Sequence, residues 1–201
     1  MKIGELIVFE GADEVGKTML ASMLAEAFGS KGIPCEVVGF PGNKVGTLGR
    51  HVNELHHYGS RFQVDQINPT SLQFLHIAAH IDTIDRQILP SLARKRIVIL
   101  DRFWWSAWIY GSVNHANKNS LKAAIQGEAI HWHGIRPARL FLVTAPTPFE
   151  KQSDLQKWKR IDHAYKKFAA QEKQKYPVTV IRNDSTPEEA LFQVQKHLKA
   201  L

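Results

Sequence analysis

The sequence has little sulfur and no long apolar run. Cysteine occurs once, at Cys35, which excludes an internal disulfide. This residue opens an apolar, strand-like stretch, so a buried structural thiol is favoured over a reactive one. No apolar run approaches the roughly 20 residues that cross a bilayer. The first five residues carry Glu5 where a signal peptide needs its apolar segment. We therefore expect a soluble, cytoplasmic protein without redox chemistry.

Low-complexity segments and internal repeats are also missing. With 201 residues, 44% apolar content and 22% charged residues, the chain has the composition of an ordinary globular protein. We expect a single domain over residues 1–201. The net charge of +7 leans toward an acidic partner, such as a phosphorylated metabolite or a nucleic acid, and does not choose between them. Solubility alone accounts for the charge equally well.

Short β-branched runs alternate with longer stretches of helical periodicity. Such alternation predicts an α/β fold, in which helices cover a parallel sheet. The runs that we expect to be strands are Leu6 to Phe9, Glu36 to Val38, Arg96 to Leu100, Leu140 to Val143 and Val178 to Ile181.

The first helix is expected from Gly16 to Phe28, because apolar residues fall on one face and Gly29 supplies a stop. Helical spacing returns in several later stretches. These are Pro69 to Leu92, Leu121 to His133, Asp154 to Lys175 and Pro187 to Leu198.

Residues 11–18 read GADEVGKT and match the pattern G-x-x-x-x-G-K-[ST]. Chance produces this pattern in roughly one in a hundred chains of this length, and the strand before it and the helix after it make a plain turn less plausible still. Glycines let successive N–H groups point inward, Lys17 reaches the β- and γ-phosphates, and the Thr18 hydroxyl ligates Mg²⁺. The residues expected around the ATP phosphates are Gly11, Asp13, Glu14, Val15, Gly16, Lys17 and Thr18.

A second acidic group is needed beside such a loop, and the third strand-like run ends in Asp101 and Arg102. An aspartate there holds Mg²⁺ directly or through water. The arginine fork suits bidentate contact with a phosphate, and transfer between two phosphates brings two anions together. The pair therefore favours a kinase with a phosphate acceptor over a plain NTPase, although an ordinary surface pair would leave the same pattern.

The motifs FEGADEVGKT at residues 9–18, FP at 40–41 and DRFWWS at 101–106 resemble the thymidylate kinase family. The resemblance implies a three-layer P-loop NTPase fold with a five-stranded parallel sheet flanked by helices. It also implies Mg²⁺ and ATP as phosphoryl donor, a deoxynucleoside monophosphate as acceptor, conversion of dTMP to dTDP, and a homodimer.

The same resemblance implies roles for individual residues. Catalysis would involve Lys17, Asp101 and Arg102, with Thr18 and Asp101 at the metal. Asp13 would meet the acceptor sugar hydroxyl and Arg102 the acceptor phosphate. The full acceptor set is Asp13, Phe40, Pro41, Lys44, Ile77, His80, Arg102, Ser106 and Tyr110, and the adenine side holds Asn183 and Thr186.

The chain departs from the family on the donor side. Glu14 stands where some members carry a catalytic arginine, and residues 144–153 of the expected lid contain no arginine. We expect a short lid-like segment around residues 144–160. The basic residues that would replace the arginine are Lys151, Lys157, Lys159 and Arg160.

It also departs on the acceptor side. Phe-Pro is followed by Gly42-Asn43-Lys44 in place of the usual acid and arginine, and Ile81 aligns with the base-reading arginine. An isoleucine cannot donate a hydrogen bond to thymine. Either His80 or Gln73 reads the base, or the base is not thymine.

Several weaker patterns leave alternatives open. His76 and His80 have the i, i+4 spacing of a zinc pair, but packing or a pocket wall is favoured. The basic stretch Asp154 to Lys175 is expected to be solvated, and we do not expect it to bind nucleic acid. Two other functions remain: a P-loop kinase for another nucleotide or nucleoside, and a nucleotide-binding module with little transfer activity.

Overall fold

The computed structural model describes residues 4–42, 44–149 and 154–198, and it divides into two compact units. Unit 1 takes its residues from the segments Met1–Val37, Ser91–Phe103 and Arg136–Leu201. Unit 2 takes its residues from Val38–Pro90 and Trp104–Ile135. The expectation of a single domain over 1–201 stays a prediction.

The chain forms a five-stranded sheet in the order β2-β3-β1-β4-β5. Strand β1 pairs in parallel with β3 and β4, and β4 pairs in parallel with β5. The strands are β1 Leu6–Glu10, β2 Cys35–Gly39, β3 Ile97–Asp101, β4 Arg139–Thr144 and β5 Val178–Arg182. Each strand contains the run expected from the sequence, except that β3 starts at Ile97, one residue after the expected Arg96. The α/β fold is therefore confirmed.

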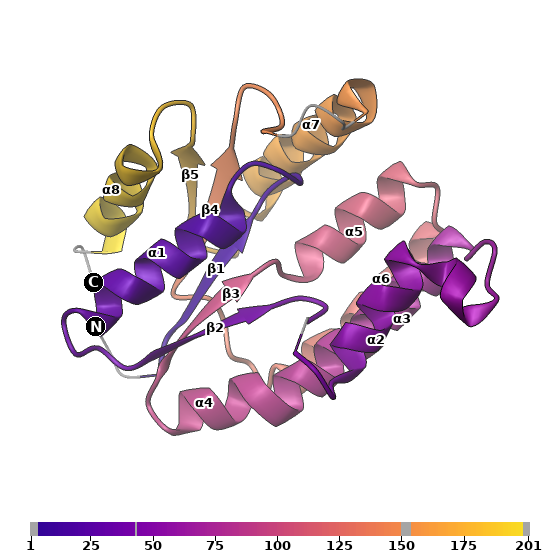
Figure 1. The fold of residues 1–201 in the computed structure, drawn as a ribbon, viewed down its shortest axis with the longest axis horizontal. Coiled ribbons are helices and arrows are strands. Elements are labelled where there is room, and N and C mark those ends of the chain that lie inside the picture. The colour runs from indigo at the N-terminus through magenta and orange to yellow at the C-terminus, as the bar shows by residue number, and fades with distance from the viewer. Residues whose placement is uncertain (1–3, 43, 150–153, 199–201) are drawn as a thin grey trace. The chain divides into compact units, whose positions relative to one another are not determined.

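Helices cover both faces of the sheet in unit 1. All five residues of β1 are buried, which requires cover on both sides. Helices α1 (Lys17–Gly29) and α8 (Pro187–Leu198) contact each other in front of the sheet, and α7 (Leu155–Glu172) runs behind it (Figure 1). This is the three-layer arrangement that the sequence predicts.

Each of these helices begins next to a residue that favours a helix start, within one residue of the start predicted from the sequence. Gly16 has a φ of +87° and precedes α1 directly. Asp154 caps α7, because its carboxylate accepts the N–H groups of Gln156 and Lys157 at 3.0 Å. Pro187 is the first residue of α8, where its missing N–H costs nothing.

Unit 2 is helical. Helix α3 (Pro69–Thr83) contacts α2 (Leu48–His57), α5 (Trp104–Val113) and α6 (Lys118–His131). Its core gathers apolar residues from three of these helices: Ile77, Ile81, Ala107, Trp108, Leu121, Ala124 and Ile125. A 3₁₀ turn η1 (Gly59–Phe62) follows α2, and a π-helical turn η2 (Ile84–Ile88) joins α3 to α4 (Leu89–Ala93). The predicted helix Pro69 to Leu92 is therefore continuous but changes its winding.

The sequence reasoning named no helix for α2 or α5. The α5 segment, WWSAWIYGSV, is apolar nearly all round, so it has no amphipathic period to detect. The α2 segment begins with Leu48 and Gly49 behind a Thr47 cap and is rich in histidine, which weakens a propensity signal. No described helix has the length and apolar character needed to traverse a bilayer.

Strand β5 lies at one edge of the sheet. The N–H of Asn183 donates to the Thr144 carbonyl at 2.8 Å, so the backbone groups of Arg182 face away from β4. There the Gln193 amide of α8 accepts from the Arg182 N–H at 3.1 Å and donates to its carbonyl at 2.9 Å.

Candidate active site

The GADEVGKT loop joins β1 to α1 in unit 1. Gly11 has a φ of +144°, and a Cβ there would lie 2.3 Å from the Val143 carbonyl oxygen. At Gly16 a Cβ would lie 2.4 Å from Asn183 Nδ2. Both positions therefore require glycine on conformation and on space. The predicted strand–loop–helix context of the phosphate motif is confirmed.

Lys17 is buried inside this loop, with only 4% of its surface exposed. Its ammonium group donates to the Ala12 carbonyl at 2.5 Å. Burial and the nearby Arg102 charge lower its pKa from 10.5 to about 8, against the opposing pull of Asp101, Asp13 and Glu10.

Thr18 and Asp101 meet across the carboxyl ends of the neighbouring strands. The Thr18 hydroxyl donates to Asp101 Oδ2 at 2.5 Å. Asp101 Oδ1 is buried, and none of the described residues donates to it. A hydroxyl beside a carboxylate oxygen that lacks a donor is the oxygen-ligand chemistry that Mg²⁺ prefers, so these residues fit the expected metal.

Arg102 lies directly after β3 and turns back toward the loop. Its φ is +74°, and its N–H donates to the Phe9 carbonyl at 2.9 Å. Its guanidinium forms an ion pair with the Asp13 carboxylate, and both side chains keep exposed surface. The structure therefore brings together Asp13 and Arg102, which the family resemblance places at the acceptor.

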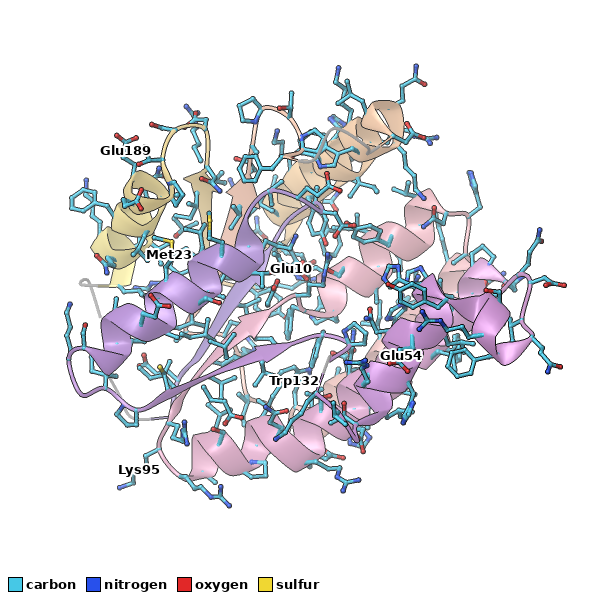
Figure 2. The ribbon with its side chains drawn as sticks, viewed as in Figure 1. Glu10, Met23, Glu54, Lys95, Trp132 and Glu189 are labelled. Carbon is cyan, nitrogen blue, oxygen red and sulfur yellow. The ribbon has the colours of Figure 1, made fainter. Side chains whose placement is uncertain are left out.

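Glu10 is a fully buried carboxylate at the end of β1, inside unit 1 (Figure 2). Its Oε1 accepts the Phe103 N–H at 2.7 Å, and its Oε2 accepts the Tyr165 hydroxyl at 3.0 Å. These bonds fix the chain just after Arg102 and tie it to α7. In the sequence Glu10 is only one letter of a motif, and its bond to Tyr165 could not be predicted, because no local pattern joins residues so far apart.

The outer face of the loop meets three donors from distant segments. Trp158 Nε1 donates to the Asp13 carbonyl at 2.7 Å, and the Phe149 N–H donates to the Glu14 carbonyl at 3.0 Å. Asn183 Nδ2 donates to the Val15 carbonyl at 2.9 Å. Sequence reasoning assigned Asn183 to the adenine side and assigned nothing to Trp158.

The other adenine-side and lid residues are surface groups. Thr186 is exposed and accepts the Glu189 N–H at 3.3 Å, so it caps α8. Lys157, Lys159 and Arg160 are exposed on the first turns of α7. Lys151 lies outside the described residues. Their roles at adenine and in a lid stay predictions.

The acceptor-side residues of unit 2 form their own buried cluster. The Phe40 ring stacks on His80, with centroids 4.0 Å apart. His80 Nδ1 lies 2.8 Å from Glu128 Oε2, and Glu128 also accepts the Trp132 Nε1–H at 3.1 Å. Only Nε2 of this imidazole is thus left to meet a base.

The remaining acceptor candidates differ in exposure. Ile77 and Ser106 are buried, Pro41 and Tyr110 are half-buried, and Lys44 is exposed. The Phe40–Pro41 peptide is cis. His76 Nε2 lies 3.3 Å from His56 Nδ1, whereas His80 Nδ1 lies against Glu128.

A family model described as thymidylate kinase matches residues 9–177. That match spans most of the chain, including the loop and the Asp101-Arg102 pair. The chain belongs to the thymidylate kinase family. A thymidylate kinase of Bartonella quintana (strain Toulouse) is 33% identical over 147 residues, and one of Bartonella henselae is 33% identical over 144 residues.

Each alignment covers 71% of this chain and 64% of the relative, so the match spans less than two thirds of these thymidylate kinases. Among solved structures, thymidylate kinase from Ehrlichia chaffeensis superposes with a TM-score of 0.77 at 22% identity. That superposition covers 96% of this chain and 98% of the other, which shows that the two share a fold. The predicted thymidylate kinase family and P-loop fold are confirmed.

Proposed function

We propose that the chain transfers the γ-phosphoryl group of Mg²⁺-ATP to a deoxynucleoside monophosphate, with dTMP as acceptor and dTDP as product. The observation that carries the proposal is the convergence of Lys17, Thr18, Asp101 and Arg102 at the phosphate loop of unit 1. The names of the relatives support dTMP as the acceptor.

Each side chain of the site has a separate role in phosphoryl transfer. Lys17 and the loop N–H groups bind the donor phosphates, while Thr18 and Asp101 hold the metal. Bound Mg²⁺ supplies neutralisation of the phosphate charge. Arg102 receives the acceptor phosphate and Asp13 the sugar hydroxyl. Catalysis then depends on positioning and electrostatics, without a covalent intermediate.

A kinase for another nucleotide or nucleoside is the second candidate. It is favoured by Ile81 at the base-reading position and by a His80 whose Nδ1 is already paired with Glu128. A site that lacks the donor for a base discriminates poorly in favour of that base. A nucleotide-binding module with little transfer activity is the third candidate.

One assay separates the three candidates. Purified protein with Mg²⁺-ATP is given a panel of ribo- and deoxynucleoside monophosphates and nucleosides, and ADP formation is followed. We expect Lys17→Ala to lower kcat/KM for dTMP about 100-fold or more, because the loop lysine stabilises transition-state charge. We expect Arg102→Ala to lower kcat/KM about 10- to 100-fold, the range for a lost charged hydrogen bond.

Lys31→Ala and Arg94→Ala are matched controls, because both side chains are exposed and distant in sequence from the loop. Activity that survives Lys17→Ala contradicts the assignment of the phosphate loop. Transfer with dTMP among the poor acceptors favours the second candidate, and ADP formation that ignores every acceptor favours the third. The homodimer, the cytoplasmic location and the lack of nucleic-acid binding are proposed on the same resemblance and composition.

A further inference from the structure

Three consecutive carbonyl groups of the phosphate loop accept hydrogen bonds from three separate segments of unit 1. Trp158 on α7 donates to Asp13, Phe149 after β4 donates through its backbone N–H to Glu14, and Asn183 after β5 donates to Val15. The distances are 2.7, 3.0 and 2.9 Å respectively. These lengths are those of ordinary, well-formed hydrogen bonds.

The direction of a carbonyl fixes the direction of the next N–H. In a trans peptide unit the two groups lie in one plane and point in opposite directions. Carbonyls of Asp13, Glu14 and Val15 that face the outer donors therefore turn the N–H groups of Glu14, Val15 and Gly16 toward the inner side of the loop. Successive inward N–H groups are what binds a phosphate in such a loop.

The two side-chain donors are held in place. Asn183 is 2% exposed and Trp158 is 5% exposed. Water therefore does not readily replace the loop carbonyl as the hydrogen-bond partner of either side chain. Asn183 also approaches the loop so closely that a Cβ on Gly16 would lie 2.4 Å from its Nδ2. Trp158 sits in the first turns of α7, which Asp154 caps.

We propose that Trp158, Asn183 and the Phe149 N–H are positioning groups that hold the phosphate loop in its binding orientation before a ligand arrives. The ligand of the loop is a triphosphate chain. The identification of that chain as part of the ATP donor rests on the proposed function. Preorganised donors avoid the cost of ordering the loop at each binding event, so the three contacts raise phosphate affinity.

The test removes each donor separately. Trp158→Phe deletes the indole N–H, Asn183→Ala deletes the amide, and Phe149→Pro deletes the backbone N–H of a half-exposed residue. The matched controls are Trp108→Phe on α5, Gln171→Ala on the exposed side of α7, and Phe149→Ala, which keeps the N–H. Binding of Mg²⁺-tripolyphosphate and of Mg²⁺-ATP is measured by calorimetry.

We expect tripolyphosphate to bind about fivefold more weakly for each donor lost, as for one ordinary hydrogen bond, with no change in the controls. Amide hydrogen exchange at Glu14, Val15 and Gly16 should accelerate in the three variants while exchange in β1 and β4 stays slow. This second measurement distinguishes a loosened loop from a protein that fails to fold.

Unchanged tripolyphosphate affinity and unchanged loop exchange would overturn the proposal. A loss confined to ATP in Asn183→Ala would assign that residue to adenine and would remove it from the positioning set. A wild-type protein that binds tripolyphosphate but transfers nothing to any acceptor would refute the proposed kinase function and leave these contacts standing. If wild-type protein does not bind tripolyphosphate, both proposals are wrong.

Discussion

Lys17 carries a buried ammonium group, and its neighbours shift the pKa of this group in opposite directions. Burial and Arg102 disfavour the charge, while the carboxylates of Asp101, Asp13 and Glu10 favour it, and the resulting pKa is about 8. The folded protein therefore binds this proton less tightly than the unfolded chain does. The free energy of unfolding should rise with pH between about 8 and 10.5, the folded and ordinary pKa values.

The same shift predicts how ATP affinity depends on pH. A phosphate chain favours the charged lysine, so binding above pH 8 must take up a proton. Affinity should then fall with rising pH, by at most about tenfold per pH unit. Calorimetry in two buffers of different ionisation enthalpy measures both the affinity and the proton uptake. Lys17→Arg is the control because arginine stays charged. A dissociation constant that is flat from about pH 7 to pH 9.5 would contradict the role of Lys17.

Single residues show where sequence reasoning stops. The glycines, Lys17 and Thr18 were predicted because their motif has a fixed spacing along the chain, and Asp101 because it ends a strand-like run. The hydrogen bonds to the outer carbonyls were not predicted, because Trp158 and Asn183 lie more than 140 residues from the loop positions they contact. A long-range hydrogen bond leaves no periodic signal, whereas a loop motif does.

Among the elements, α7 has two faces with different roles. Trp158, Ile161, Tyr165 and Ala169 recur at helical spacing and are buried. The basic residues expected to be solvated are indeed exposed on this helix. The sequence drew attention to the charged face, but the buried face is the one that carries hydrogen bonds to the phosphate loop and to Glu10.

Glu10 links β1 to α7 and to the segment after β3, and this predicts a measurable coupling. Glu10→Gln keeps an oxygen that accepts the Phe103 N–H, but its amide nitrogen forces the Tyr165 hydroxyl to accept instead of donate. The stronger hydrogen bonds to a carboxylate are lost, so we expect a loss of about 1–3 kcal/mol in unfolding free energy. Tyr165→Phe should cost about 1 kcal/mol. Chemical denaturation of both variants and of the double variant gives the coupling energy. Strict additivity of the two losses would show that the Glu10–Tyr165 bond contributes nothing.

On the scale of the whole molecule, the phosphate loop and the partners named above belong to unit 1. They come from segments at the start, the middle and the end of the chain. The sequence predicted all five strands and most of the helices, because alternating apolar periods report burial directly. It did not predict a second compact unit, since helix packing among α2, α3, α5 and α6 depends on which faces meet rather than on any local pattern.

Binding of Mg²⁺-ATP to the phosphate loop should raise the melting temperature of the protein. Mg²⁺-ATP at about 100 times its dissociation constant should stabilise the folded state by about 2.7 kcal/mol and raise the melting temperature by about 5–10 °C. Differential scanning calorimetry measures the shift. Lys17→Ala should abolish it, and Lys31→Ala should retain it. A shift of equal size in Lys17→Ala would place ATP elsewhere.

The Gln193 contact has a consequence for how the molecule behaves at high concentration. An edge strand exposes peptide groups to which another chain can add, and this is a common route to aggregation. One side-chain amide offers a donor and an acceptor together, as a peptide group does, and Gln193 presents both to the backbone of Arg182. At that point β5 already has a neighbour, so an incoming strand would have to displace part of α8 before it could pair.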